Sequence, residues 1–130
     1  MKRVAQCNCG QLQAICDGDP VRISVCHCLA CKRRTGTAFA HNATFRSEQV
    51  RIEGRSLSYS RITDTDHTNT FNFCPDCGAT VFFAVEIRPG TTAIPVGAFA
   101  DPDFPAPTVE VYPQRKVGWC RIDLDGATAP

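Results

Sequence analysis

Short runs of β-branched and aromatic residues alternate with turn-forming residues along most of the chain. Gly, Pro, Asn and Asp recur every several residues and separate runs rich in Val, Ile, Phe and Thr, which is typical of an antiparallel all-β protein. Within the runs, apolar and polar positions often alternate, as Val21, Ile23 and Val25 do with Arg22 and Ser24. A period of two places one face of a strand against a core. The pattern predicts strands at residues 12–16, 22–26, 37–45, 50–52, 57–62, 70–73, 80–85, 92–96 and 117–124.

Helix is predicted to be scarce, so the expected fold class is mainly β, with antiparallel sheets and one or two short helical turns. One helical turn is expected at residues 29–34, because Gly36 can adopt the left-handed conformation that ends a helix. Residues 101–113 contain four prolines, which lack the N–H that a central strand needs, and are predicted to form a surface loop. The length of 130 residues allows one core, so we expect a single domain over 1–125 and a frayed tail at 126–130.

The charge balance argues against strongly charged partners. Lys and Arg total 14 and Asp and Glu total 13, which leaves a formal net charge of +1. Such a chain has no strong field to attract nucleic acid or an anionic membrane, and we expect neither as a partner. No stretch is long and apolar enough to span a bilayer, and the N-terminal residues are too polar for a signal-peptide core. The expected location is the cytoplasm, and the pattern carries no signal for an oligomeric state.

Nine cysteines in one short chain are the strongest chemical signal. A reducing cytoplasm disfavours disulfides and favours metal binding or catalysis by the same residues. The odd number also argues against a fully paired disulfide framework. We therefore interpret most of the cysteines as metal ligands.

Two cysteine pairs that are far apart in the sequence are suited to one zinc ion. Cys74 and Cys77 form a CxxC followed by glycine, whose tight turn lets both thiolates reach one metal. Cys7 and Cys9 form a CxC, and residues two apart in an extended chain project to the same side. The four sulfurs together would complete a tetrahedral site without a vacancy, which is the pattern of a structural zinc.

A third cluster places Cys26, Cys28 and Cys31 within six residues. Three protein thiolates leave the fourth position of a tetrahedral zinc open, which is the pattern of a catalytic or ligand-binding ion. His27 points away from its cysteine neighbours if the stretch is extended, so we expect it to form a wall and not to be a ligand. The alternative of one zinc ribbon, in which Cys28 and Cys31 join the later CxxC pair, stays open, although the intervening stretch exceeds the usual roughly 15–20 residues.

Four further residues with ligating groups stand apart from these clusters. Cys16 and Cys120 are expected to be small buried apolar residues. Either cysteine could instead supply the fourth ligand of the third cluster, and the open position would then disappear. His41 and His67 lack metal-ligand spacing, so we interpret them as ordinary surface or core residues.

In their order and separations, the clusters resemble the glutathione-dependent formaldehyde-activating enzyme family, also called the centromere-protein-V/Gfa-type domain. The matching motifs are CNCG at 7–10, CHCLACKRRTG at 26–36, FNFCPDCGA at 71–79, GAFADP at 97–102 and KVGW at 116–119. The resemblance covers almost the whole chain. It implies a β-tent of antiparallel sheets with two zinc ions per chain, a structural ion in the four-cysteine set and a catalytic ion in the three-cysteine set, in agreement with the spacing argument.

The resemblance also implies an activity. Members of the family join the thiol of glutathione to formaldehyde and give S-hydroxymethylglutathione, formally a carbon–sulfur lyase acting in reverse. Many members carry a histidine just before the aromatic residue that ends the prolyl loop, whereas this chain reads Val109, Glu110, Val111, Tyr112. The resemblance therefore defines the fold and metal ligands better than the substrate. Two alternatives stay open: a thiol-binding carrier or sensor without catalysis, and a structural zinc domain that serves macromolecular contacts.

The residues after the third cluster carry the expected substrate contacts. Three thiolates and a bound substrate thiolate give zinc an excess of negative charge, which nearby cations should offset. Lys32, Arg33 and Arg34 can do this or bind the carboxylates of a glutathione-like ligand, with the two arginines favoured. Thr35 offers a hydroxyl that can stabilise an alkoxide formed from the aldehyde. The aromatic candidates for a pocket wall, which in small β proteins more often lie in the core, are Phe39, Tyr112 and Trp119.

Overall fold

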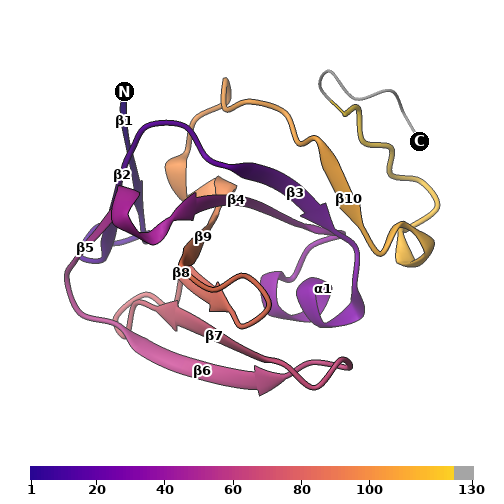
Figure 1. Ribbon diagram of the computed structural model, residues 1–130, viewed down its shortest axis with the longest axis horizontal. Coiled ribbons are helices and arrows are strands. Elements are labelled where there is room, and N and C mark those ends of the chain that lie inside the picture. The colour runs from indigo at the N-terminus through magenta and orange to yellow at the C-terminus, as the bar shows by residue number, and fades with distance from the viewer. Residues whose placement is uncertain (125–130) are drawn as a thin grey trace.

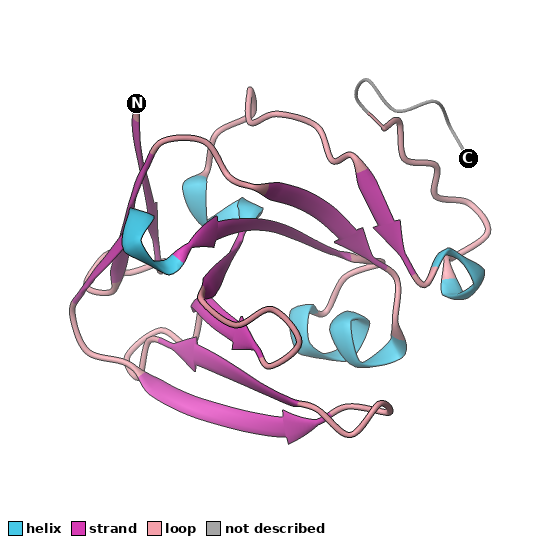
Figure 2. Ribbon diagram, viewed as in Figure 1, coloured by secondary structure: helices cyan, strands magenta, loops and turns pink. Residues whose placement is uncertain are grey.

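The computed structural model describes residues 1–124, which fold mainly into β-strands. Helix is confined to the short segments drawn in cyan in Figure 2. The strands are β1 Lys2–Gln6, β2 Gln13–Asp17, β3 Arg22–Cys26, β4 Ala40–Arg46, β5 Val50–Glu53, β6 Leu57–Ile62, β7 Thr68–Phe73, β8 Thr80–Val85, β9 Thr91–Pro95 and β10 Val109–Val111. The helices of the same range are α1 Leu29–Thr35 and the 3-10 helices η1 Ser47–Gln49, η2 Val96–Phe99 and η3 Pro113–Arg115. The mainly β fold class predicted from the sequence is confirmed.

These strands form two sheets (Figure 1). One sheet has the order β1-β2-β5, and the other has the order β10-β3-β4-β9-β8-β7-β6. Neighbouring strands are antiparallel except for β10, which runs parallel to β3. The seven-stranded sheet bends so that β3 and β4 lie across from β6 and β7, and α1 lies in the opening between them (Figure 1). The bend brings the helix close to strands from both halves of the sheet.

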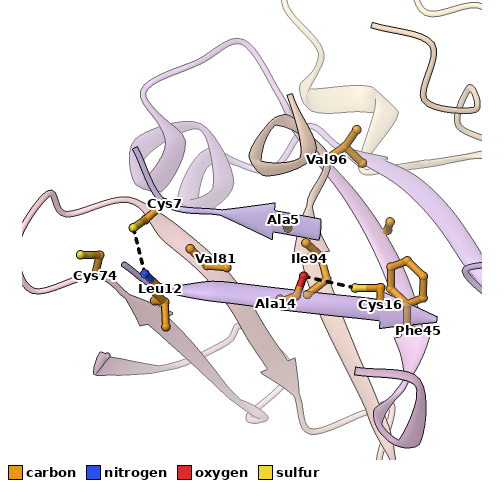
Figure 3. Close-up of a cluster of buried hydrophobic side chains, with 11 residues drawn as sticks. Ala5, Cys7, Leu12, Ala14, Cys16, Phe45, Cys74, Val81, Ile94 and Val96 are labelled. Atoms are coloured by element: carbon orange, nitrogen blue, oxygen red, sulfur yellow. Dashed lines mark hydrogen bonds between the residues drawn. The ribbon is translucent and has the colours of Figure 1, made fainter. Parts of the chain in front are cut away.

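The main core fills the space between the two sheets. Figure 3 shows Ala14 and Cys16 of β2 beside Phe45 of β4 and Ile94 of β9. The buried cluster consists of Ala5, Cys7, Leu12, Ala14, Cys16, Ala43, Phe45, Cys74, Val81, Ile94 and Val96. Burial raises the pKa of the Cys16 thiol to about 11, although the charge of Arg3 opposes it. Cys16 is therefore a buried apolar residue, as predicted.

The opposite side of the seven-stranded sheet faces α1, and we call it the inner face. Phe71 of β7 pairs with Phe83 of β8, and Phe83 pairs with Ala93 of β9. Ala93 in turn pairs with Thr44 of β4. Directly paired residues project to the same side of a sheet, and residues two apart in a strand share a face. The inner face therefore carries these residues together with Asn42, which lies two residues before Thr44.

The sequence pattern did not predict two short strands, β1 and β10. β1 has little apolar alternation, since only Ala5 of its five residues is buried. The loop predicted at 101–113 is wrong for Val109–Val111, which form the edge strand β10. The prolines of this segment lie on either side of Val109–Val111. The N–H groups of these three residues are therefore free to pair with β3.

The strand predicted at 117–124 is wrong. The Cys120 N–H donates to the Val117 carbonyl at 3.2 Å, so the chain closes a turn here, and the Trp119 side chain is 79% exposed. An apolar alternation forms a strand only when it pairs with another strand, and residues 117–124 pair with none of the described strands. The tail expected to fray at 126–130 lies outside the described residues. No helix within residues 1–124 has the length and apolar character needed to cross a membrane.

Gly54 is expected to be intolerant of any side chain. Its φ is +101°, and an added Cβ would lie 2.1 Å from the carbonyl oxygen of Gln11. We expect Gly54→Ala to lower the free energy of unfolding by about 3–4 kcal/mol, because a backbone clash adds to the strain of positive φ. Gly90→Ala is the control, since Gly90 has φ +76° and open space around it, and should cost about 1–2 kcal/mol. Urea unfolding measures both values, and equal losses would rule out the clash.

Candidate metal sites

The fold brings Cys7, Cys9, Cys74 and Cys77 together. Their sulfur atoms lie within 4.8 Å of one another, with 3.6 Å between those of Cys7 and Cys9 and 3.7 Å between those of Cys9 and Cys74. Four thiolates around a tetrahedral zinc, each at about 2.3 Å, would be about 3.8 Å apart, whereas a disulfide bond is about 2.05 Å long. The spacing of this four-cysteine group therefore fits a metal ion with the donor set that zinc prefers.

The chain around Cys74 is shaped to hold a thiolate. Gly78 has φ +81°, and its N–H donates to the Cys74 carbonyl at 2.8 Å, which closes the CxxC turn. The Cys74 sulfur accepts hydrogen bonds from the Asp76 N–H at 3.3 Å and from Gln11 Nε2 at 3.0 Å. Burial raises the pKa of the Cys74 thiol, but these bonds and one from the Cys77 N–H outweigh burial and lower the pKa to about 6. Cys74 is thus prepared for the ionised form that binds metals.

Cys7 is held in a similar way at the other end of the group. The Leu12 N–H donates to the Cys7 sulfur at 3.3 Å, as the dashed line in Figure 3 shows, and the Cys7 N–H donates to the Leu12 carbonyl at 3.0 Å. These bonds close the loop between β1 and β2. Cys7 and Cys74 are both buried, so the group joins the small sheet to the β7–β8 turn within the core.

The second group, the three-cysteine group, forms where β3 ends and α1 begins. Cys26 is the last residue of β3, Cys28 is the N-cap of α1, and Cys31 lies in its first turn. Their sulfurs lie within 4.8 Å of one another, and the Cys28 sulfur accepts a hydrogen bond from the Cys31 N–H at 3.2 Å. Neither Cys16 nor Cys120 joins them, nor does any other His, Cys, Asp or Glu of residues 1–124. Because the two CxxC pairs belong to different groups, the fold does not form the alternative zinc ribbon.

His27 lies between two of these cysteines in sequence but projects to the other side of β3. Its side chain is 0% exposed, and its ring centroid lies 5.9 Å from that of Phe39. His27 Nε2 is 3.7 Å from Glu110 Oε1, and the His27 N–H donates to the Val111 carbonyl at 2.9 Å. Strand β10 therefore lies beside the end of β3, and two of its residues contact His27 next to the three-cysteine group.

The three basic residues of α1 point in different directions, because successive residues of a helix are about 100° apart. Lys32 Nζ donates to the carbonyl of Arg115, which ties α1 to η3. Arg33 is exposed to solvent. Only Arg34 reaches across to the inner face of the sheet.

Arg34 stacks on the aromatic pair of the inner face. Its guanidinium carbon lies 4.6 Å from the ring centroid of Phe71 and 5.1 Å from that of Phe83. Its Nε is buried and has no hydrogen-bond partner among the residues described. A hydrogen bond with Cys26 and burial raise the pKa of the Cys31 thiol, and the charge of Arg34 opposes this effect. Arg34 therefore places a positive charge beside the three-cysteine group.

Thr35 contributes to the end of α1. Thr35 Oγ1 donates to the Cys31 carbonyl at 2.8 Å and lies 2.6 Å from Thr37 Oγ1. Gly36 follows with φ 67°, and its N–H donates to the Lys32 carbonyl at 2.8 Å. The predicted helix and its glycine stop are confirmed, and the Thr35 hydroxyl is engaged with the helix backbone.

The aromatic candidates do not form one pocket wall. Trp119 and Tyr112 are exposed, whereas Phe39 packs against His27. His67 lies in the β6–β7 turn with Nδ1 3.0 Å from Thr65 Oγ1.

One buried polar residue escaped the sequence reasoning. Asn42 lies on the inner face, is 8% exposed, and has an Oδ1 atom without a hydrogen-bond partner in the described part of the chain. The signal that could have found it is an amide on the buried side of β4, a strand of otherwise mostly buried residues.

Comparisons with known proteins agree with this description. The family model described as glutathione-dependent formaldehyde-activating enzyme matches residues 2–115, a range that contains both cysteine groups. Among solved structures, the chain is similar in fold to a crystal structure of a Rhodobacter sphaeroides protein, with a TM-score of 0.58 and 24% sequence identity over 75% of this chain and 86% of that one. No curated protein matches the chain. The extent of the family match shows that the chain belongs to the glutathione-dependent formaldehyde-activating enzyme family.

Proposed function

We propose that the protein is a zinc-dependent enzyme that joins a small thiol, glutathione or a close analogue, to formaldehyde or another small aldehyde. The observation that carries this proposal is the three-cysteine group, whose sulfurs converge without a fourth side chain from residues 1–124. In this proposal Cys26, Cys28 and Cys31 hold a zinc ion with one open position, and the four-cysteine group holds a structural zinc. The thiols must stay reduced, which suits the cytoplasm.

Ionisation of the substrate thiol explains only part of such a catalysis. Zinc, when bound, supplies a positive centre that keeps a thiol ionised at neutral pH. A free thiol with a pKa near 8.5 is about 3% ionised at pH 7, so full ionisation raises the reactive fraction by roughly thirtyfold at most. The remaining acceleration must come from side chains that position the two reactants and stabilise the charge that develops.

Arg34 is suited to stabilise that charge. In the proposed reaction the substrate sulfur bonds to the aldehyde carbon, the π electron pair of the carbonyl moves to oxygen, and the oxygen takes up a proton equivalent to the one that the thiol released. The Phe71 and Phe83 rings hold the Arg34 guanidinium in place, and its Nε has no acceptor within residues 1–124. Arg34 can therefore donate to the developing oxyanion without breaking an existing hydrogen bond.

Two neighbours of Arg34 have supporting roles in this proposal. Arg33 is exposed on the same helix and is assigned to a carboxylate of a glutathione-like substrate at the rim of the site. Thr35 is assigned to the end of α1, where its hydroxyl donates to the Cys31 carbonyl and so stabilises the helix that contains Cys31 and is capped by Cys28.

The proposal is tested by following the exchange of ¹³C-formaldehyde with glutathione by NMR, with and without the zinc-loaded protein. We expect the protein to increase the exchange rate at matched concentrations of both reactants. Equal rates with and without protein would reject the enzyme. If glutathione still bound to the protein in that case, a carrier or sensor function would replace the proposed enzyme function.

Arg34→Gln is expected to lower the rate of this exchange by about tenfold, because the charged donor is lost while the length of the side chain is nearly kept. Zinc content should not change, since Arg34 is not a ligand. Arg51→Gln is the control, because it removes the same charge from an exposed position on β5. A similar loss in both variants would mean that Arg34 acts only through the overall charge of the protein.

A further inference from the structure

Asn42 is a buried polar side chain without a role in the chemistry described so far. It is 8% exposed, and its Oδ1 atom is shielded from solvent and accepts no hydrogen bond from residues 1–124. An amide oxygen that is removed from water and receives no donor is unfavourable, and native proteins rarely keep one without a reason. A bound ligand that supplies the donor is such a reason.

The register of the sheet places Asn42 next to the three-cysteine group. Asn42 of β4 pairs directly with Ser24 of β3, and Cys26 lies two residues further along the same face of β3. Diagonal neighbours of this kind are about 7–8 Å apart. This separation is short enough for a small group of a ligand to reach Asn42 when its sulfur is held at Cys26 and its two partners.

The hydrogen-bonding groups of the site are complementary to a hydroxyl. Among residues 1–124, Asn42 Oδ1 on the sheet has no hydrogen-bond donor, and Arg34 Nε, which comes from α1, has no acceptor. A hydroxyl oxygen can receive one hydrogen bond and donate another. An aldehyde oxygen can accept hydrogen bonds but has no hydrogen to donate, and the same is true of an ionised thiol.

We propose that Asn42 is a specificity-determining residue whose Oδ1 accepts a hydrogen bond from the hydroxyl of the thiol–aldehyde adduct. This inference rests on the proposed function and adds to it the recognition of the adduct. Arg34 donates to the oxygen of both the aldehyde and the adduct, so it does not distinguish them. Asn42 does distinguish them, because only the adduct carries the hydrogen that its oxygen needs. The site therefore binds an S-hydroxymethyl group in preference to an S-methyl group.

The test compares two glutathione derivatives that differ only in this hydroxyl. S-Hydroxymethylglutathione, formed from glutathione and formaldehyde, and S-methylglutathione are titrated into the zinc-loaded protein by calorimetry. We expect the first to bind about tenfold more tightly to the unmodified protein, the usual worth of one hydrogen bond to a buried group. In Asn42→Leu, which keeps the size of the side chain and removes the acceptor, the ratio of the two dissociation constants should fall to about one.

Thr44→Val is the matched control, because Thr44 is another buried polar residue on the inner face of β4, two residues further from Cys26 than Asn42. It should keep the tenfold preference. Zinc content and the melting temperature are measured for each variant, and Asn42→Ala replaces Asn42→Leu if leucine does not fit. A preference that persists in a folded, zinc-loaded Asn42 variant would overturn the inference, as would equal affinities in the unmodified protein. If the unmodified protein bound neither compound, the proposed function itself would fail.

Discussion

Cys74→Ser is expected to leave the protein unfolded and without the metal of the four-cysteine group. Cys74 is buried, its sulfur lies 3.7 Å from that of Cys9, and it belongs to both the sulfur group and the main core. A serine hydroxyl does not ionise near neutral pH and is not among the usual zinc ligands. A structural zinc contributes roughly 10–16 kcal/mol in small domains, which is comparable to the whole stability of about 5–15 kcal/mol. Amide NMR dispersion and thermal melting by circular dichroism measure the loss.

Cys16→Ser is the control for this substitution. Cys16 is equally buried in the same cluster but belongs to neither sulfur group. It should fold with a loss of roughly 1–3 kcal/mol, the cost of placing a hydroxyl in an apolar site. If Cys74→Ser kept the melting temperature of Cys16→Ser, the four-cysteine group would not be structural.

Cys28→Ser is expected to remain folded while losing one zinc ion and all affinity for glutathione. The side chain of Cys28 caps the N-terminus of α1 by accepting the Cys31 N–H, and serine is among the best residues for that position. The local helix is therefore preserved. The second metal site would keep only Cys26 and Cys31 as ligands, which is too few to retain zinc tightly. Zinc per chain, an amide NMR spectrum and glutathione titration measure the three outcomes.

Cys120→Ser is the comparison for Cys28→Ser, because Cys120 is a partly buried cysteine outside both groups. It should keep two zinc ions per chain and bind glutathione like the unmodified protein. An unfolded Cys28→Ser would remove the distinction between a structural and an open site. Undiminished glutathione binding in Cys28→Ser would show that the thiol binds elsewhere.

The central strands of the seven-stranded sheet follow directly from the alternation of apolar residues. β3, β8 and β9 occur close to where the pattern predicts them, because such strands bury one or both faces and show it in the sequence. β10 does not, because an edge strand of three residues is defined by the partner it meets and not by its own composition. The same reason explains why the alternation at 117–124 forms no strand.

The partition of the cysteines is also apparent in the sequence, since CxC and CxxC spacings each present two sulfurs to one point through local geometry. Tertiary structure was needed to show that the pairs at 7–9 and 74–77 meet, and that no fourth residue of 1–124 closes the other group. The hydrogen bonds that lower the Cys74 pKa come partly from Gln11, which is 63 positions away in the chain. Spacing alone carries no information about such a contact.

The sequence by itself determined the mainly β fold class, the short helix with its glycine stop and the local cysteine spacings at 7–9, 26–31 and 74–77. All of these depend on residues within one turn or one strand. Only the tertiary structure decided that Arg34 and not Lys32 reaches the inner face, that Glu110 stands behind His27, and that Asn42 is buried beside Cys26. These contacts join separate elements, so they depend on strand register and on the bend of the sheet, which the packing of the whole chain establishes.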